Sequence, residues 1–424
     1  MTVSSMPSGV SRGAPIAALV LLLLVVPLLW ADPWGLAPWR ATGIVLAWSG
    51  AGLLLASLVL MVREVRLVQW LGGLDRMMIW HHRTGYGAYV LLLAHPLALA
   101  LDAWQDAAPR GWQLLSPWTE SWPIWLGWAS LLVMMAGMAS TMLPRLPYGV
   151  WRRLHAVLGF GVVLGFVHVL LLGMDAGAVL ATAVAAVLLI WRWRRVDSGT
   201  AARPYVVRSV QPVAQSLVEI ALTPLAMPVS VEPGQFVYVA FFQGPGYHGC
   251  GEYHPFTVSS SAAAGQLSLG VKALGDCTRC MQTLQAGVAA RVQGPFGDFL
   301  AKRPAGPQLW VAGGIGITPF LAALRSEKVL QPVHLLYLFA TKADAAFLDE
   351  LQALALANPL FSLDAHATGE GPADLNTLLP TNAALQGQAC YLCGPPGLVA
   401  SVRRALQLRG IPAQHIHFEN FDFR

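Results

Sequence analysis

Four histidines in the first half of the chain are spaced in a way that could bind haem iron. His81 and His95 lie in one apolar segment, and His155 and His168 lie in another. Ionisable side chains are expensive inside a membrane helix, and their presence there usually marks function. Neutral imidazoles that face each other across two helices can supply both axial ligands of a haem iron. Two such pairs at different depths predict two haems, and hydrogen bonding between helices is the alternative for any single histidine.

The spacing within each pair can be compared with an ideal helix. The step of 14 residues from His81 to His95 turns a helix by about −40° and climbs roughly 21 Å, so both side chains share a face near opposite edges of a hydrocarbon core about 30 Å thick. His82 would be misplaced by about 140°, which favours His81 as the ligand. The second pair is 13 residues apart, so we expect a bulge or tightened turn to absorb the difference. The segment has three glycines at which this could happen: Gly159, Gly161 and Gly165.

The elements that must hold these histidines are membrane helices. The chain has 424 residues, of which 55% are hydrophobic and 12% are charged, whereas soluble proteins average about 25% charged residues. The apolar excess is confined to the first half. Six apolar segments there are long enough to cross a bilayer, at 14–30, 41–62, 84–103, 122–143, 154–174 and 176–191. They predict an all-α six-helix membrane bundle within residues 1–195.

Charged residues alternate between the connections of these segments. Arginines precede the third and fifth segments and follow the sixth, whereas the other connections carry mostly Asp and Glu. The positive-inside rule places the arginine side, both termini and the second half of the chain in the cytoplasm. Residues 1–31 could instead be a cleaved signal, which would leave the remaining topology unchanged. The net charge of +5 comes largely from these arginines, and no basic patch interleaved with aromatics suggests a nucleic-acid partner.

The second half of the chain has the composition of a soluble protein and two successive patterns. Short alternating runs broken by Pro and Gly turns predict an antiparallel β-barrel within residues 196–303. Strands then alternate with helices through residues 304–424, which is typical of an α/β doubly wound nucleotide-binding domain.

Five cysteines, all after residue 249, include Cys277-x-x-Cys280 and Cys390-x-x-Cys393. More than 100 residues separate these two pairs, so they do not predict a zinc ribbon. In a cytoplasmic domain we expect reduced thiols.

Two segments of the barrel have side chains suited to a flavin. The first offers an imidazole, an aromatic face and hydroxyls for the diphosphate, ring and N5 edge of the flavin: His254, Pro255, Phe256, Thr257, Ser259 and Ser260. The second could place backbone N–H groups and a hydroxyl against phosphate: Lys272, Gly275 and Thr278. An ordinary barrel strand and a polar turn are the alternatives for these segments.

Two segments of the α/β part are suited to a dinucleotide. The turn after its first strand contains Gly313, Gly314, Gly316, Thr318 and Pro319. Glycines permit close backbone approach, Pro suits the first helical position, and a helix N-terminus offers N–H groups to a pyrophosphate. A tight structural turn is the alternative. Another strand ends in Cys393, Gly394 and Pro395, at the edge where open sheets bind ligands, and Phe423 lies near the C-terminus.

In their order along the chain, these residues resemble the ferric reductase and NADPH oxidase superfamily, in particular its compact bacterial oxidase-like members. The resemblance extends from about residue 40 to the end and includes the histidines and the segments HPFTVSS, VKALGDCT, GPFGDF, GGIGITPF and YLCGPPG. It implies two b-type haems, one ligated by His81 with His155 and the other by His95 with His168. It also implies FAD on the two barrel segments, NADPH or NADH on the two α/β segments, and Phe423 stacked on the flavin ring.

The activity that the resemblance implies is transmembrane electron transfer. Electrons from cytoplasmic NAD(P)H would pass through FAD and the haems to an outer acceptor, either dioxygen, giving superoxide, or a ferric chelate. Thr257, Cys393 and Phe423 would line the hydride-transfer site. The alternative is a redox-relay subunit that delivers electrons to a periplasmic partner protein. The implied location is the bacterial inner membrane, with the dehydrogenase half in the cytoplasm.

The chain departs from the family pattern at two places. Thr341 and Lys342 stand where the family often has an arginine for the 2′-phosphate of NADPH, so the choice between NADPH and NADH stays open. Cys277 occupies a position that is usually aromatic.

Overall fold

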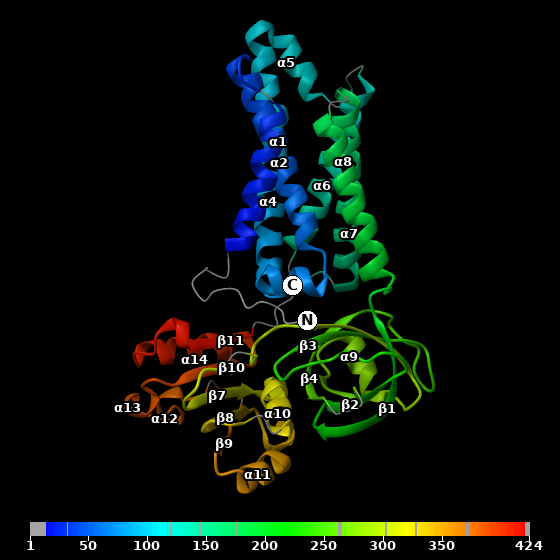
Figure 1. Ribbon diagram of the computed structural model, residues 1–424. Helices are drawn as coiled ribbons and strands as arrows, with labels where there is room; N and C mark the ends of the chain where they lie inside the picture. Colours follow the sequence, from blue (N-terminus) through cyan, green and yellow to red (C-terminus); the bar gives the residue numbers. More distant parts are fainter. Residues whose placement is uncertain are drawn as a thin grey trace. The chain divides into compact units, whose positions relative to one another are not determined.

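The structure is a computed structural model, and it describes residues 14–419 except 32, 117, 119–120, 144–145, 147, 174–175, 262–264, 302, 327–328, 370 and 372. The chain divides into two compact units, Met1–Thr200 and Ala201–Arg424 (Figure 1). The first unit is helical. The second unit contains a β-barrel and an α/β sheet.

The helices of the first unit follow the predicted apolar segments, with two short helices added. They are α1 (Ala14–Ala31), α2 (Pro38–Leu60), α3 (Val65–Trp70), α4 (Leu74–Asp106), α5 (Ala108–Leu115), α6 (Trp122–Thr141), α7 (Tyr148–Leu172) and α8 (Ala176–Arg192), with a π-helical turn at Trp193–Asp197. Five helices of the described residues, α2, α4, α6, α7 and α8, are long and apolar enough to cross a membrane. The described apolar stretch of α1, Ala14–Leu29, is shorter than these, so the six-span count stays a prediction.

Small residues let α2 approach α4 closely. A Cβ atom added to Gly43 would lie 2.6 Å from Leu99 Cδ2, and one added to Gly50 would lie 2.7 Å from Leu92 Cγ. Membrane helices often pack through small residues in this way, because lipid provides little hydrophobic drive for their association. The approach brings backbone atoms of α2 within reach of side chains on α4.

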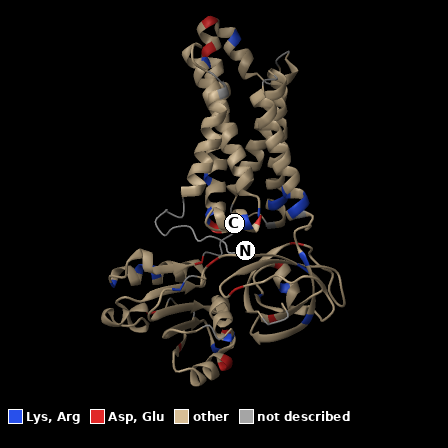
Figure 2. Cartoon of the chain, in the orientation of Figure 1, with Lys and Arg blue, Asp and Glu red and all other residues tan. Residues whose placement is uncertain are grey.

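Charged residues gather at the two ends of the helix bundle and are scarce along its length (Figure 2). The end of α8 meets the end of α2, where Arg192 Nη1 donates a hydrogen bond to Met61 O at 3.1 Å. Arg195 pairs with Glu64 at 3.4 Å nearby. The arginines that follow the sixth predicted segment therefore lie beside the end of the second.

The first part of the second unit is a closed six-stranded barrel. Its strands are β1 (Arg203–Ala214), β2 (Leu217–Pro224), β3 (Phe236–Phe241), β4 (His254–Ser261), β5 (Leu267–Lys272) and β6 (Ala289–Phe296), in the order β1-β2-β5-β4-β3-β6. All pairs are antiparallel, which confirms the predicted antiparallel barrel. Alternate residues of the strands fill its interior, among them Val207, Ile220, Val237 and Leu269. Helix α9 (Asp276–Cys280) and the 3-10 turn Met281–Thr283 follow β5.

The second part is a five-stranded parallel sheet in the order β11-β10-β7-β8-β9. Its strands are β7 (Gln308–Gly313), β8 (Val333–Phe339), β9 (Phe361–Ala367), β10 (Ala389–Cys393) and β11 (Ile416–Phe418). Its helices are α10 (Thr318–Arg325), α11 (Leu348–Ala357), α12 (Leu375–Leu378), α13 (Asn382–Leu385) and α14 (Pro396–Leu408), with 3-10 turns at Gly314–Ile317, Lys342–Asp344 and Ala413–His415. Trp310 packs with α10 and α11 on one face, and its neighbours Leu309 and Val311 pack with α14 on the other. Both faces of the sheet are thus covered by helices.

An ion-pair network connects the barrel to the parallel sheet. Arg325, the last residue of α10, contacts Glu219 of β2 at 2.6 Å and Glu350 of α11 at 2.7 Å. Ser259 Oγ donates to the same Glu219 at 2.6 Å. Burial opposes the charge of Arg325, but the hydrogen bonds with Glu350 and Glu219 raise its pKa above the usual value. The guanidinium therefore stays charged and holds the two parts of this unit together.

Candidate functional site

The histidines of the first predicted pairing, His81 on α4 and His155 on α7, lie side by side. Their ring centroids are 6.2 Å apart, with an interplanar angle of 75°. His81 Nδ1 is 2.8 Å from Ser57 Oγ and 3.1 Å from Ser57 O on α2. His82 is exposed.

The second pairing, His95 on α4 and His168 on α7, shares one cavity. His95 Nδ1 donates to Gly43 O at 2.8 Å, and His168 Nδ1 donates to Pro123 O of α6 at 2.7 Å. The ring of His168 lies so close to α6 that a Cβ on Gly127 would be 2.8 Å from its Cε1 atom. The neighbouring helices therefore supply hydrogen-bond acceptors to these histidines, α2 to His95 on α4 and α6 to His168 on α7.

These backbone contacts determine the chemistry of the imidazoles. A carbonyl oxygen only accepts, so the Nδ1 atoms of His95 and His168 carry the proton and their Nε2 atoms have a free lone pair. An Nδ1–H donated to a carbonyl is the usual outer partner of a metal-ligating histidine. His155 differs, because its Nδ1 is buried without a hydrogen-bond partner among the described residues.

The ring spacing of the first pair and the cavity that the second pair shares are compatible with haem. With metal–nitrogen bonds of about 2 Å, and ring nitrogens about 1.1 Å from the ring centre, two imidazoles on opposite sides of one metal have centroids roughly 6 Å apart. His81 and His155 meet this spacing. The cavity that His95 and His168 line has a volume of about 580 Å³, within the range of small-molecule and cofactor sites, about 300–1,000 Å³. Its walls are mostly apolar, with Trp48 of α2 among them.

Helix α7 does not contain the expected irregularity. It is α-helical without interruption from Tyr148 to Leu172, so the prediction of a bulge or tightened turn at Gly159, Gly161 or Gly165 is wrong. The side chains of His155 and His168 leave the helix about 140° apart in azimuth. The ring of His155 stacks on Trp151, one turn earlier in the same helix, with centroids 5.1 Å apart.

Arg40, at the start of α2, also lines the cavity with His95 and His168. A guanidinium is well suited to pair with carboxylates. The sequence analysis did not single out Arg40 or the backbone acceptors of Gly43, Ser57 and Pro123. Two of these acceptors could have been found from their spacing, because Gly43 and Ser57 on α2 are 14 residues apart, as His81 and His95 are on α4.

The first predicted flavin segment forms strand β4. His254, Pro255 and Phe256 are partly exposed at its start, and Thr257 is buried. Ser260 is partly exposed at the other end of the strand. The side chain of Ser259 does not fit the predicted flavin contact, because it is fully buried and its hydroxyl is bound to Glu219.

The second predicted flavin segment is the turn between β5 and α9. Lys272 ends β5 and is partly exposed, and Gly275 is exposed. Thr278 Oγ1 accepts hydrogen bonds from Leu274 N and Gly275 N, both at 2.9 Å. The hydroxyl predicted to meet phosphate therefore stabilises the turn itself.

The two predicted dinucleotide segments meet at the carboxyl edge of the parallel sheet. A Cβ added to Gly316 would clash with Cys393 O, and one added to Gly394 would lie 3.1 Å from Gly313 Cα. Gly314 has φ +53° and no other atom within 4 Å of its would-be Cβ, so its backbone is open to a ligand. Thr318 and Pro319 begin α10 directly after this turn.

Of the other two residues predicted to line the hydride-transfer site, only Cys393 lies within the described residues. The thiol of Cys393 is fully buried, and burial raises its pKa well above the ordinary value. A buried, protonated thiol does not support a chemical role for this side chain, although its carbonyl helps to form the turn contact with Gly316. Phe423 lies outside the described residues.

The loop after β8 presents a carboxylate. Asp344 Oδ2 accepts hydrogen bonds from Thr341 N at 3.1 Å and from Thr341 Oγ1 at 2.7 Å. Lys342 is exposed beside it. In dinucleotide-binding sheets, an acidic residue near this edge binds the ribose hydroxyls of NAD, whereas an arginine accommodates the 2′-phosphate of NADP.

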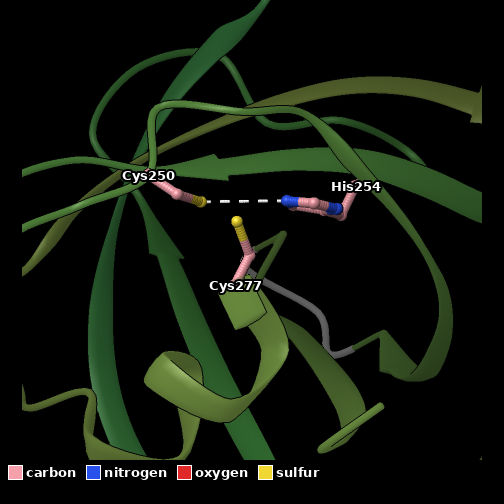
Figure 3. Close-up of side chains that lie close together, drawn as sticks. All are labelled: Cys250, His254 and Cys277. Carbon is pink, nitrogen blue, oxygen red and sulfur yellow. Dashed lines mark hydrogen bonds between the residues drawn. The ribbon is translucent and has the colours of Figure 1, made fainter. Parts of the chain in front are cut away.

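A group of side chains that sequence reasoning did not connect surrounds His254. Sγ of Cys250, in the loop before β4, lies 3.8 Å from His254 Nε2. The side chain of Cys277, on α9, points toward both residues (Figure 3). Burial opposes ionisation of Cys250, but the hydrogen bond with His254 lowers its pKa to about 7. Burial and the neighbouring Cys250 raise the pKa of Cys277 to about 12. The spacing Cys250-x-x-x-His254 was the available signal.

Two family models match the chain. Residues 46–166 match the ferric reductase like transmembrane component, and residues 204–301 match an FAD-binding domain. The first part of the chain is therefore that of a multi-pass membrane protein, and the barrel is an FAD-binding domain.

Individual relatives are redox proteins. The chain is 27% identical over 211 residues to the ferredoxin–NAD(P)(+) reductase component of naphthalene 1,2-dioxygenase/salicylate 5-hydroxylase systems from a Ralstonia species, covering 46% of this chain and 62% of that protein. It is 28% identical over 209 residues to a flavohemoprotein of Pseudomonas putida, covering 46% and 52%. Less than two thirds of either relative is thus matched. The flavohem-like FAD/NAD-binding domain of nitric oxide dioxygenase from Vibrio cholerae aligns with 21% identity and a TM-score of 0.46, covering 52% of this chain and 99% of that domain.

Proposed function

Given that this chain belongs to the ferric reductase and NADPH oxidase superfamily, we propose that it is a transmembrane oxidoreductase that takes electrons from NAD(P)H and delivers them to an acceptor across the membrane. FAD and two b-type haems are the proposed carriers. The observation that carries the proposal is the set of four histidines on α4 and α7, three of which have Nδ1 bound by a neighbouring helix. Imidazoles held in this way offer Nε2 to a metal.

His81 with His155, and His95 with His168, are the proposed axial ligand pairs. The ring spacing of the first pair and the shared cavity of the second support this assignment. Arg40 is the proposed partner of the carboxylates of the haem on the second pair.

FAD accepts a hydride and releases single electrons when bound, and haem iron carries one electron at a time. The chain contributes binding and orientation. His254 and Phe256, partly exposed at the start of β4, are the proposed contacts of the flavin, and the Thr257 hydroxyl is the proposed hydrogen-bond donor to its ring edge. Phe423 is the proposed cover of the flavin ring.

The α/β part is the proposed NAD(P)H-binding domain, of the doubly wound class. The close contact of Gly316 with the carbonyl of Cys393, and the open backbone of Gly314, let a pyrophosphate approach the start of α10. The carboxylate of Asp344 favours NADH, because it would repel a 2′-phosphate and can accept a hydrogen bond from a ribose hydroxyl.

The proposed orientation has the arginine-rich end of the helix bundle in the cytoplasm of a bacterium, with the enzyme in the inner membrane. The nucleotide is then oxidised inside and the acceptor reduced outside. Dioxygen and ferric chelates are the proposed acceptors, since each needs only an accessible low-potential carrier at the outer surface.

The test is consumption of NADH and NADPH by the purified, detergent-solubilised protein. Rates are measured first with dioxygen and then, without oxygen, with a ferric chelate. Rapid reduction of the carriers followed by turnover with either acceptor supports the proposal. Absence of carrier reduction by both nucleotides would overturn it, whereas reduction without turnover would indicate a relay to another protein.

A further inference from the structure

We propose that Cys250, His254 and Cys277 form a binding site for a zinc-class divalent ion. Two sulfur atoms and one imidazole nitrogen lie within 4.8 Å of one another. They come from the loop before β4, from the start of β4 and from α9. Among the described residues this is the one group of three such ligands that close together. Figure 3 shows all three ligand atoms directed toward a common point.

The distances suit tetrahedral zinc. With Zn–S bonds of about 2.3 Å and Zn–N bonds of about 2.0–2.1 Å, a sulfur and a nitrogen ligand are about 3.6 Å apart, and two sulfur ligands about 3.8 Å. Cys250 Sγ and His254 Nε2 are 3.8 Å apart. Small rotations of the side chains are therefore enough to complete the bonds.

The ligand set selects the type of ion. Thiolate and imidazole ligands favour zinc and related soft ions over magnesium and calcium, which prefer oxygen. Each of the three residues is partly exposed, so water can occupy the fourth position. Binding releases the thiol protons, since the ligands are thiolates and a neutral imidazole.

The convergence of three groups favours a metal over other uses of the cysteines. A disulfide between Cys250 and Cys277 would need no contribution from His254, yet the imidazole points at Cys250. Cys280, three residues after Cys277 on the same helix, is exposed and outside the cluster. It is a matched control for the cysteines that are inside.

The experiment uses the full chain in detergent, reduced with a phosphine and stripped with EDTA. Zn²⁺ is added, unbound metal is removed by desalting, and zinc per chain is measured by mass spectrometry. Because His254 is also proposed to hold FAD, we expect uptake of about one zinc per chain, with loss of FAD, in the wild type and in C280S. C250S and C277S should weaken the affinity at least about 100-fold, since loss of outer-shell partners alone lowers affinity about 10- to 100-fold.

A second readout needs no variant. Zn²⁺ should protect Cys250 and Cys277 of the wild type from iodoacetamide but leave Cys280 reactive, as followed by peptide mass spectrometry. X-ray absorption at the zinc edge should show two sulfur ligands at about 2.3 Å. Equal zinc uptake by wild type, C250S and C277S, or no protection of Cys250 and Cys277 in the wild type, would overturn the proposal.

Discussion

The imidazoles of His81 and His155, on different helices of the membrane unit, lie with their ring centroids 6.2 Å apart. This separation is about what two axial ligands of one metal require. Nδ1 of His81 is hydrogen-bonded to Ser57 of α2, so the position of the ring depends on the packing of α2 against α4. The neighbouring His82 has no comparable position, because it is exposed.

Replacement of single histidines tests the haem assignment. His81→Ala and His95→Ala should each lower the haem content from two to about one per chain, because each removes one axial ligand from one pair. The pyridine haemochrome assay, normalised to protein, measures this content. FAD content should not change, since the flavin is proposed to bind in the barrel.

His82→Ala is the matched control, because it removes an adjacent imidazole from the same helix. It should retain two haems. Loss of haem in His82→Ala with retention in His81→Ala would reverse the ligand assignment.

Arg325 should be important for the stability of the second unit. Arg325→Met leaves Glu219 and Glu350 without their shared cation, and breaking such a buried pair typically destabilises by about 3–5 kcal/mol. Glu350 is 38% exposed, so we expect roughly 2–3 kcal/mol here. The release of flavin fluorescence on heating should shift down by several degrees.

Arg279→Met provides the comparison, since Arg279 pairs with Asp276 at 3.8 Å and both side chains are largely exposed. Exposed pairs contribute little, so no measurable shift is expected. Similar shifts in the two variants would show that the Arg325 network does not stabilise the unit.

The choice of nucleotide should depend on Asp344. We expect the wild type to prefer NADH, and Asp344→Asn to reduce that preference roughly tenfold, because one unit charge near a phosphate is worth about 1–4 kcal/mol at this kind of surface. Asn keeps an acceptor for the Thr341 hydrogen bonds. The kcat/KM ratio for the two nucleotides measures the effect.

Asp349→Asn removes an exposed carboxylate five residues further along and should leave the ratio unchanged. A wild type that prefers NADPH would argue against the role given to Asp344.

Zinc and FAD should compete, because His254 belongs to both proposed sites. Added Zn²⁺ should slow the reduction of flavin by NADH and promote release of FAD, and EDTA should reverse both effects. Cys277→Ser should be resistant and Cys280→Ser sensitive. Equal inhibition of both variants would show that zinc inhibits by binding at another site. Zinc binding to Cys250, His254 and Cys277 is tested separately, by metal uptake and by protection of the cysteines.

Sequence patterns predicted those features that depend on local periodicity. The 14-residue step between His81 and His95 places both on one face whatever the helix packs against. The helix that contains them is longer than predicted, beginning at Leu74 rather than near residue 84, because Asp75, Arg76 and Arg83 lower the hydropathy without interrupting the helix. The glycine turns of the α/β part were found because close backbone contact restricts residue type.

Features that depend on tertiary contact could not be predicted in the same way. The acceptor at Pro123 is a backbone carbonyl, which every residue has, so no residue type reveals it. Cys250 and Cys277 are 27 residues apart and meet only because a loop and α9 close over the start of β4. Ser259 was assigned to flavin from its motif, but the strand turns its side chain toward Glu219.

The most direct test is the spectrum of the purified protein, with haem and flavin quantified per chain. We expect two haems and one FAD per chain, and a reduced-minus-oxidised spectrum of b-type haem with two imidazole ligands. The reduced protein should not bind carbon monoxide, because both axial positions are filled. A preparation with full FAD but no haem, or haems that bind carbon monoxide stoichiometrically, would contradict it.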